Sequence, residues 1–343
     1  MVRVGINGFG RIGRCFLRAA VHDPEVEVVA VNDLGDIENL AYLLRHDSVY
    51  GAFAGQVSVD PSTSSGQASL RIGAKPVKVF QEKDPAKIPW GSVGADIIVE
   101  STGRFSDYAA ARAHLQGGAK RVVISAPAHG DGSLGATVLM GVNVERLKTC
   151  PVTSNASCTT NSASPLIAIL DEALGVERAL LNTVHAYTAT QSVVDSPVRG
   201  SDLRRGRAAA HNIVPSSTGA AVAVTKAYEQ LAGRFDGISL RVPVVAGSIA
   251  DITFISKKET TAQEVNKILE DAAGQERWHG IFTTTKEPLV SSDIVGDSHA
   301  SIADLSMTRV IGNLVKVLAW YDNEMGYTHT LLRHVKEAGK HIS

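Results

Sequence analysis

The sequence predicts an α/β protein of two domains, in which a first domain with a parallel sheet is joined to an α+β domain with a largely antiparallel sheet. Two observations favour this fold class. Short apolar strands alternate with helical segments through the first hundred or so residues, which implies crossover connections and parallel strands. After about residue 158 the expected strands are longer and alternate in polarity, and they are more segregated from the helices.

The elements of the first domain follow in chain order. Apolar and β-branched runs predict strands at residues 2–7, 26–31, 95–100 and 121–125. The spacing of apolar residues predicts helices at 12–21 and 108–115. Residues 60–69 form a polar cluster rich in Ser, for which we expect a hairpin tip or a surface loop.

The second domain combines helices with longer strands. Helices are predicted at residues 164–174, 217–231 and 264–273, and strands at 237–243, 249–257 and 314–321. The 192–210 loop shows little periodicity and carries four arginines, and long irregular segments often serve binding or assembly. A last helix, at 330–338, is expected to return to the first domain. We therefore expect a first domain of residues 1–157 plus 323–343 and a second domain of residues 158–322, which includes the 192–210 loop.

Composition gives no electrostatic case for nucleic acid or a membrane surface as a partner. The 343 residues are 44% hydrophobic and 20% charged, and 34 Lys and Arg stand against 35 Asp and Glu, so the net charge is −1. The three cysteines are sparse, the N-terminal segment lacks signal-peptide features, and no apolar stretch approaches the ~20 residues of a membrane span. We expect a cytoplasmic protein with no nucleic-acid or membrane partner and no metal site.

A glycine-rich turn joins the first strand to the first helix. Gly8, Gly10 and Gly13 form the pattern G-x-G-x-x-G, and Asp33 follows twenty residues after Gly13 at the end of the second strand. Gly8 permits a tight turn, Gly10 lets the backbone approach a pyrophosphate, and Gly13 lets the helix pack closely on the strand. Asp33 is placed to accept hydrogen bonds from ribose hydroxyls and would repel a 2′-phosphate. These residues predict a Rossmann-type domain that prefers NAD to NADP.

Cys158 is the candidate nucleophile. It lies between Ser157 and Thr159 at the expected start of a helix, where the partial positive charge of the N-terminus lowers the pKa of a thiol. His185 follows a predicted strand, and a Cys/His pair can activate the thiol and then move protons. On spacing alone both alternatives stay open, because a single cysteine is more often a small buried side chain and the chain has eleven histidines. Pro165 predicts either a kink or a later helix start.

These residues belong to a series of motifs that resembles type I glyceraldehyde-3-phosphate dehydrogenase, a phosphorylating family. The motifs run in the family's order: NGFGRIGR at 7–14, VND at 31–33, ESTG at 100–103, ISAPA at 124–128, SNASCTTN at 154–161, HAYTATQ at 185–191, LRRGRAAA at 203–210, PSSTGAA at 215–221, LRVP at 240–243 and WYDNEMGY at 320–327. The resemblance implies that Cys158 attacks the aldehyde of glyceraldehyde 3-phosphate with His185 as base. Hydride would pass to NAD, and inorganic phosphate would release the thioester as 1,3-bisphosphoglycerate.

The resemblance also implies further site residues and an assembly. At the cofactor it implies Arg11 and Ile12 for the pyrophosphate, Lys83 and Ser125 along the adenine and nicotinamide sides, Asn323 at the carboxamide and Tyr327 near the nicotinamide. It implies Thr188, Arg205 and Arg241 at the substrate phosphate, and Ser157, Thr159, Thr218 and Gly219 at inorganic phosphate. Hydroxyls and guanidinium groups suit phosphate geometry. A homotetramer is implied because the 192–210 loop resembles the segment that reaches a neighbouring subunit's cofactor site.

Four positions depart from the family's pattern. Lys83 stands where many members have arginine, Ser162 replaces a common cysteine, and Met325 often corresponds to tryptophan. Ser196 differs from the leucine–proline pair of NAD-type members and resembles members that also accept NADP. NADP is therefore an alternative cofactor.

Two alternative functions fit the sequence less well. Erythrose-4-phosphate dehydrogenase has a similar nucleophile motif but differs around the histidine, where this chain has Thr188-Ala189-Thr190. A binding protein that keeps the fold without catalysis would be expected to lose Cys158, His185 or the phosphate residues, and none of them is lost.

Overall fold

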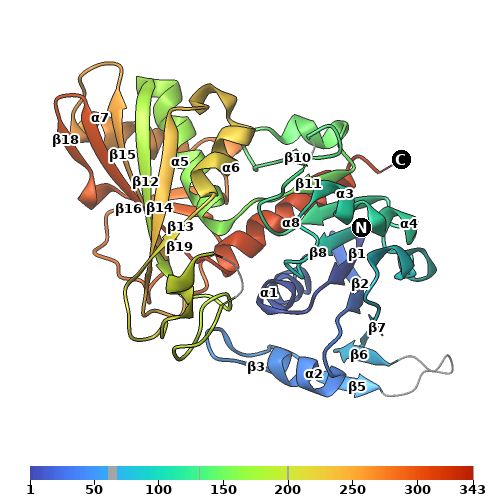
Figure 1. Ribbon diagram of the computed structural model, residues 1–343. Coiled ribbons are helices and arrows are strands. Elements are labelled where there is room, and N and C mark those ends of the chain that lie inside the picture. Colours follow the sequence, from blue (N-terminus) through green and yellow to red (C-terminus); the bar gives the residue numbers. More distant parts are fainter. Residues whose placement is uncertain (61–67, 131, 199–200, 343) are drawn as a thin grey trace. The chain divides into compact units, whose positions relative to one another are not determined.

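The protein is described by a computed structural model over residues 1–60, 68–130, 132–198 and 201–342 (Figure 1). The chain divides into two compact units. The first contains Met1–Val138, Val144–Ala156 and Leu331–Ser343, and the second contains Leu139–Asn143 and Ser157–Thr330. Relative to the expected limits of 1–157 plus 323–343, the first unit leaves out residues 139–143, Ser157 and residues 323–330. No described helix is long and apolar enough to cross a membrane.

The first unit is built on a nine-stranded sheet with the order β10-β11-β9-β8-β1-β2-β7-β6-β5. All neighbours from β10 to β7 pair in parallel, whereas β5 and β6 form an antiparallel edge. The strands are β1 (Val2–Asn7), β2 (Val26–Asn32), β5 (Val57–Asp60), β6 (Ser69–Ile72), β7 (Lys75–Phe80), β8 (Ile97–Glu100), β9 (Arg121–Ile124), β10 (Ala136–Thr137) and β11 (Val152–Ser154). The four strands predicted for this domain are therefore confirmed as β1, β2, β8 and β9.

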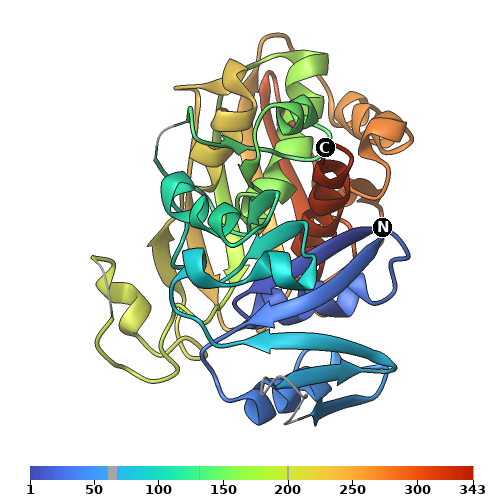
Figure 2. The same ribbon diagram turned by 90° about the vertical axis from the view of Figure 1, so that its right-hand side faces the viewer.

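Helices and a small hairpin complete the first unit. The helices are α1 (Arg11–Ala20), α2 (Ile37–Arg45), α3 (Tyr108–Ala111) and α4 (Ala113–Gln116), and β3 (His46–Asp47) pairs with β4 (Gly51–Ala52). Figure 2 shows α2, in blue, beside the light-blue strands β5 and β6, and α2 packs on β5. The single helix predicted at 108–115 is divided at Arg112, where the amide of Leu115 bonds the Arg112 carbonyl in a tighter i→i+3 turn.

The expected hairpin tip at 60–69 is described only at its ends. β5 and β6 pair antiparallel, with Asp60 opposite Ser69, as the prediction requires. Residues 61–67 lie outside the described part of the chain, as does Arg199 of the 192–210 loop.

The second unit contains an eight-stranded, largely antiparallel sheet with the order β13-β14-β12-β15-β19-β17-β16, and β18 pairs with β19. The strands are β12 (Val176–Ala186), β13 (Val214–Ser217), β14 (Phe235–Val242), β15 (Ser248–Ser256), β16 (Phe282–Thr285), β17 (Ser301–Asp304), β18 (Arg309–Ile311) and β19 (Leu314–Tyr321). Its helices are α5 (Cys158–Leu174), α6 (Ala220–Ala227) and α7 (Ala262–Ala273). One apolar core joins α5, α6 and α7 to the sheet. The fold class predicted from the sequence is confirmed.

Three helix predictions for the second half of the chain need correction. The helix predicted at 164–174 begins at Cys158, because the Ser157 side chain accepts a hydrogen bond from the Thr160 amide and caps the first turn. Pro165 lies inside α5 and removes only one amide donor. The helix predicted at 217–231 is three elements, namely the end of β13, α6 and a 3₁₀ turn at Glu229–Leu231. The C-terminal helix, α8 (Met325–Gly339), begins five residues early because Asp322 accepts from the amides of Glu324 and Met325.

Candidate active site

Cys158 is the first residue of α5 and lies in the second unit. The residue is half-buried, and its thiol lies at the N-terminal end of α5, whose first turn contains no acidic residue. The peptide dipoles of α5 therefore place partial positive charge next to the sulfur. Just before it, Ala156 adopts φ 53°, the only left-handed non-glycine conformation among the described residues. This costs of order 1–3 kcal/mol, and such strain clusters at functional sites.

His185 lies next to Cys158 through the pairing of distant elements. It sits near the end of β12, it is 2% exposed, and its Nε2 is 3.3 Å from the Cys158 Sγ. Its Nδ1 is 2.6 Å from the Ala186 carbonyl oxygen and 2.8 Å from Nη1 of Arg241. A carbonyl can only accept, so the shorter contact assigns the ring proton to Nδ1, and Arg241 donates to the same carbonyl at 3.2 Å. The lone pair of Nε2 then faces the thiol.

Burial opposes charge on both members of this pair. Burial raises the pKa of the Cys158 thiol, although the Arg241 charge and hydrogen bonds from Thr159 act to lower it. Burial together with the Arg241 charge lowers the pKa of His185 to about 3, and the Ala186 carbonyl acts against this shift. Burial thus favours the uncharged form of each group, and a neutral imidazole can accept the thiol proton.

Two arginines and a group of hydroxyls lie around the pair. Arg241 stands opposite His185 in the β12–β14 register, and within the described residues its buried Nε has no hydrogen-bond partner. Arg205 donates from Nη1 to the Thr190 hydroxyl at 3.2 Å, which is 3.0 Å from the Thr188 hydroxyl. Arg205 and Thr188, two of the residues predicted at the substrate phosphate, are thus linked through Thr190. The charges of Arg205 and Arg241 both act to lower the pKa of His185.

The residues predicted at the inorganic phosphate gather where α5 and α6 begin. The Ser157 hydroxyl is 2.7 Å from the Thr160 hydroxyl, which donates to the carbonyl of Ala220 at 3.4 Å. Thr218 accepts from the Ala220 amide, and Gly219 is the N-cap of α6, where an added Cβ would meet no atom within 4 Å. Helix N-termini with free space in front of them bind anions well.

Thr159 differs from the other predicted phosphate ligands. The residue is 4% exposed, and its hydroxyl lies 2.8 Å from the hydroxyl of Tyr321 rather than at the open end of α5. Tyr321 also lies 2.7 Å from the Thr183 hydroxyl, and its ring meets the His185 ring edge-on at 6.0 Å. The sequence pattern predicts Tyr321 only as the last residue of a strand. Its place in the WYDNEMGY motif was the one signal that could have identified it.

The glycine turn of the first unit has the stereochemistry that its pattern predicts. Gly8 has φ +94°, and an added Cβ would lie 2.6 Å from the Thr102 amide nitrogen. A Cβ on Gly13 would lie 2.2 Å from the Gly8 carbonyl oxygen, whereas a Cβ on Gly10 would meet nothing within 4 Å. Gly10 is the N-cap of α1 and has no side chain to fill that space. The open space in front of the helix N-terminus fits a pyrophosphate.

The remaining predicted cofactor residues of the first unit lie near the carboxyl ends of its strands. Asp33 follows β2 and accepts from the Phe9 amide at 2.7 Å, and Ser125 follows β9. Arg11, which precedes Ile12 in α1, forms an ion pair with Asp47 at 2.6 Å. Lys83 is exposed beyond β7, in a segment whose backbone is bonded to the Asn32 side chain.

Two predicted cofactor residues lie in the second unit. Asn323 is 5% exposed, and its side-chain oxygen accepts from the Gly247 amide and the Ser248 hydroxyl, each at 3.1 Å. These bonds orient its amide group. Tyr327 is 3% exposed in the first turn of α8. Across the described residues no group of three or more His, Cys, Asp or Glu side chains could hold a metal ion.

Comparison with known proteins gives a consistent result over nearly the whole chain. Residues 2–108 match the NAD binding domain of glyceraldehyde 3-phosphate dehydrogenase, and residues 157–323 match its C-terminal domain. The chain is 46% identical over 334 residues to glyceraldehyde-3-phosphate dehydrogenase 1 of Streptomyces avermitilis, covering 96% of each chain. It is 45% identical over 348 residues to the enzyme named glyceraldehyde-3-phosphate dehydrogenase in Mycobacterium avium, covering 99% of each. The chain therefore belongs to the glyceraldehyde 3-phosphate dehydrogenase family.

Proposed function

We propose that this protein oxidises D-glyceraldehyde 3-phosphate to 1,3-bisphosphoglycerate with NAD and inorganic phosphate, through a thioester on Cys158. The observation that carries the proposal is the 3.3 Å contact between the Cys158 sulfur and His185 Nε2 at the N-terminus of α5. A thiolate is the nucleophile that such a reaction needs, because a thioester retains the free energy of the oxidation until phosphate attacks.

The first half of the reaction uses the Cys–His pair. The thiol proton moves to His185 Nε2, Sγ bonds to the aldehyde carbon, and His185 passes the proton on to the carbonyl oxygen to give a thiohemiacetal. The carbon then loses hydride and the hydroxyl proton returns to His185, which leaves a thioester. His185 Nε2, 3.3 Å from the sulfur, is thus placed to accept a proton in each of these steps and to give it back within the site.

The second half requires phosphate at the thioester. A phosphate oxygen bonds to the acyl carbon, the C–S bond breaks, and Cys158 leaves as the thiolate. Arg205, Thr188 and Arg241, whose buried Nε lacks a partner among the residues that the structure describes, would hold the phosphate of the substrate. Ser157, Thr218 and Gly219, where α5 and α6 begin, would hold inorganic phosphate, and Thr159 would act from its buried position beside the thiol.

NAD supplies the hydride acceptor when it is bound. Gly8, Gly10, Arg11, Ile12 and Gly13 would hold its pyrophosphate at the N-terminus of α1, where the missing Cβ of Gly10 leaves open space. Asp33 would accept from the ribose hydroxyls, Lys83 and Ser125 would line the nucleotide, and Asn323 and Tyr327 would orient the nicotinamide. Ser196 supports some use of NADP.

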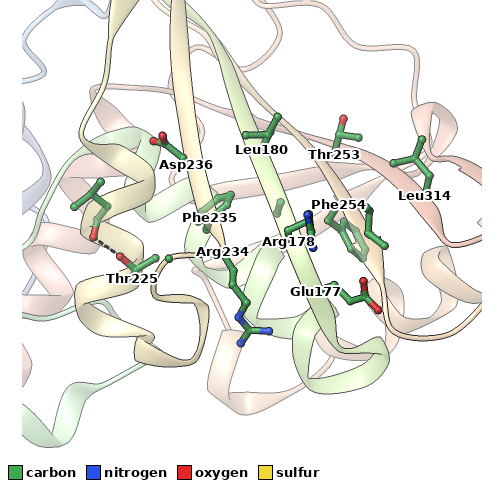
Figure 3. A pocket seen from close by; sticks show the side chains of 14 residues that line it. Glu177, Arg178, Leu180, Thr225, Arg234, Phe235, Asp236, Thr253, Phe254 and Leu314 are labelled. Atoms are coloured by element: carbon green, nitrogen blue, oxygen red, sulfur yellow. Dashed lines mark hydrogen bonds between the residues drawn. The ribbon is translucent and has the colours of Figure 1, made fainter.

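We also propose a homotetramer, supported by two separate apolar surfaces on the second unit. The solvent face of its sheet exposes Leu180 by 67% and Ile238 by 55%, beside a hollow of about 970 Å³ that Leu180 and Leu314 line (Figure 3). The segment around the 192–210 loop exposes Val193 by 82% and Leu203 by 75%. Large exposed apolar side chains of this kind mark protein interfaces, and closed tetramers of dihedral symmetry need more than one interface. A cytoplasmic location is supported by the low, odd number of cysteines.

The decisive experiment removes the thiol and keeps a matched cysteine control. Cys158→Ala should lower phosphate-dependent NADH formation about 10³-fold or more and abolish labelling by iodoacetate at that position. Cys150→Ala removes the other half-buried thiol and should stay close to the parent rate. Substantial phosphate-dependent NADH formation by Cys158→Ala, or an equal loss of rate in both variants, would refute the proposal.

A further inference from the structure

One buried serine joins the side chain of Asn323 to the backbone of Ala186. Ser248 is the first residue of β15 and is 1% exposed. Its hydroxyl accepts a hydrogen bond from the Ala186 amide at 3.1 Å and donates to the side-chain oxygen of Asn323 at 3.1 Å. The Gly247 amide donates to that same oxygen, also at 3.1 Å. All four residues belong to the second unit.

A polar side chain is unexpected on this face of β15. Strand alternation places Ser248 on the same side as Ala250, Ile252 and Phe254, which are buried in the apolar core. Burying a hydroxyl without partners would cost free energy, but the Ser248 hydroxyl has both an acceptor and a donor role here. The position therefore has a polar task, which an alanine of nearly the same size could not perform.

The hydrogens available fix the orientation of the Asn323 amide group. The backbone amides of Ala186 and Gly247 can only donate, so the Ser248 oxygen accepts from Ala186 and its own hydrogen is left for Asn323. The Asn323 atom that faces Gly247 must be the oxygen, since an NH₂ group there would meet a second donor. Nδ2 of Asn323 is then directed away from both donors and can donate to a ligand.

The backbone of Ala186, from which this chain of hydrogen bonds starts, is itself held at both of its polar groups. Its carbonyl oxygen accepts from His185 Nδ1 at 2.6 Å and from Arg241 Nη1 at 3.2 Å, while its amide donates to Ser248. The residue that fixes the ring of the proposed base therefore also fixes the hydroxyl behind Asn323.

We propose that Ser248 is a positioning residue that holds the Asn323 amide ready to donate to the carbonyl oxygen of the nicotinamide carboxamide. The inference rests on the proposed function, in which Asn323 orients the nicotinamide. Ser248 acts through Asn323 and touches neither NAD nor the substrate in this scheme, so it is not a catalytic residue. Its effect is confined to the nicotinamide end of the cofactor, because the pyrophosphate and the adenosine ribose are assigned to residues of the first unit.

The test compares the binding of NAD with that of ADP-ribose, which lacks the nicotinamide, by calorimetric titration without turnover. Ser248→Ala should weaken NAD binding about five- to tenfold, because the Asn323 amide loses one of the two hydrogen bonds that orient it. The affinity for ADP-ribose should stay unchanged. Ser248→Cys is nearly isosteric with serine but has only a weak S–H donor, so it should weaken NAD binding in the same selective way.

A double-mutant cycle tests whether Ser248 acts through Asn323. Asn323→Ala should itself weaken NAD binding, and adding Ser248→Ala should then produce no further loss. Losses that add in full would mean that the two residues act independently, and would overturn the proposal.

Ser239→Ala is the matched control, since Ser239 is a fully buried serine of β14 whose hydroxyl has no hydrogen-bond partner among the described residues. It should leave both affinities unchanged. The proposal is refuted if folded Ser248→Ala binds NAD as tightly as the parent, or if it weakens NAD and ADP-ribose equally. If Ser248→Ala does not fold, Ser248→Cys decides by the same criteria. Failure of the proposed function would appear separately, as phosphate-dependent NADH formation that survives in Cys158→Ala.

Discussion

Asp33 is a residue with two tasks, and they can be separated experimentally. Its two carboxylate oxygens accept from the backbone amides of Phe9 and Gly35, at 2.7 and 2.8 Å, so it ties the glycine turn to the end of β2. The same negative charge is expected to meet the ribose and to repel a 2′-phosphate.

Asp33→Ala should therefore raise the ratio of kcat/KM with NADP to kcat/KM with NAD by about tenfold, equivalent to roughly 1.4 kcal/mol. Asp36→Ala is the control, because Asp36 is a nearby carboxylate that caps α2 by accepting from the Asn39 amide. It should reduce stability by about 1 kcal/mol and leave the cofactor ratio unchanged. An unchanged ratio in Asp33→Ala would mean that other residues set the preference for NAD over NADP, and Ser196 would be the next position to substitute.

Site residues differ in how well the neighbouring sequence predicts their place in the structure. Gly8, Gly13 and Asp33 follow from local stereochemistry, because strand, turn and helix are contiguous. Spacing alone does not distinguish Cys158 and His185 from the other Cys/His combinations of the chain, and only the surrounding motifs identify this pair. Tyr321 was missed because its partners Thr159 and Thr183 are 162 and 138 residues away, and an alternating strand pattern indicates burial without saying which hydroxyls meet.

At the scale of elements, the two glycines of the β1–α1 turn that begin and enter the helix lack a side chain for different reasons, one for packing and one for space for a ligand. A Cβ on Gly13 would lie 2.2 Å from the Gly8 carbonyl oxygen, whereas a Cβ on Gly10 would occupy open space at the N-terminus of α1. The two glycines have different reasons to lack a side chain.

Gly13→Ala should lower the free energy of unfolding by about 1–3 kcal/mol, because α1 must move away from β1. Gly10→Ala should change it by no more than about 0.5 kcal/mol but weaken NAD binding about tenfold or more, since the methyl group takes space meant for the pyrophosphate. Denaturant unfolding without NAD and calorimetric titration with NAD measure the two effects. Normal NAD affinity in Gly10→Ala would place the pyrophosphate elsewhere.

Element boundaries were harder to predict than element types, for reasons that differ from case to case. Apolar spacing placed the start of α5 at 164, but the capping hydroxyl of Ser157 begins the helix at Cys158 in spite of Pro165. The predicted 217–231 helix overlooked the end of β13, because Ser217 pairs with Ile238 in β14, and such pairing with a distant strand has no local signal.

At the scale of the whole molecule, the change from interleaved to segregated strands predicted a parallel sheet followed by a largely antiparallel one. The strand order could not be predicted, because β12 pairs in parallel with β14 and antiparallel with β15, and only the folded sheet selects those neighbours. The exposure of the sheet's solvent face could not be predicted either, because the local sequence indicates only that Leu180 and Ile238 lie in strands.

The proposed tetramer makes a prediction about these exposed side chains. In a tetramer of dihedral symmetry each protomer uses at least two different self-complementary surfaces, so disrupting one should leave dimers and disrupting both should leave monomers. Leu180→Asp with Ile238→Asp alters the sheet face, and Leu203→Asp alters the loop surface; sedimentation velocity should report a dimer for each and a monomer for the combination. Val290→Asp, a comparably exposed apolar residue at 56%, lies outside both surfaces and should remain tetrameric. A parent protein that sediments as a monomer at micromolar concentration would refute the assembly, and would leave both apolar surfaces in need of another partner.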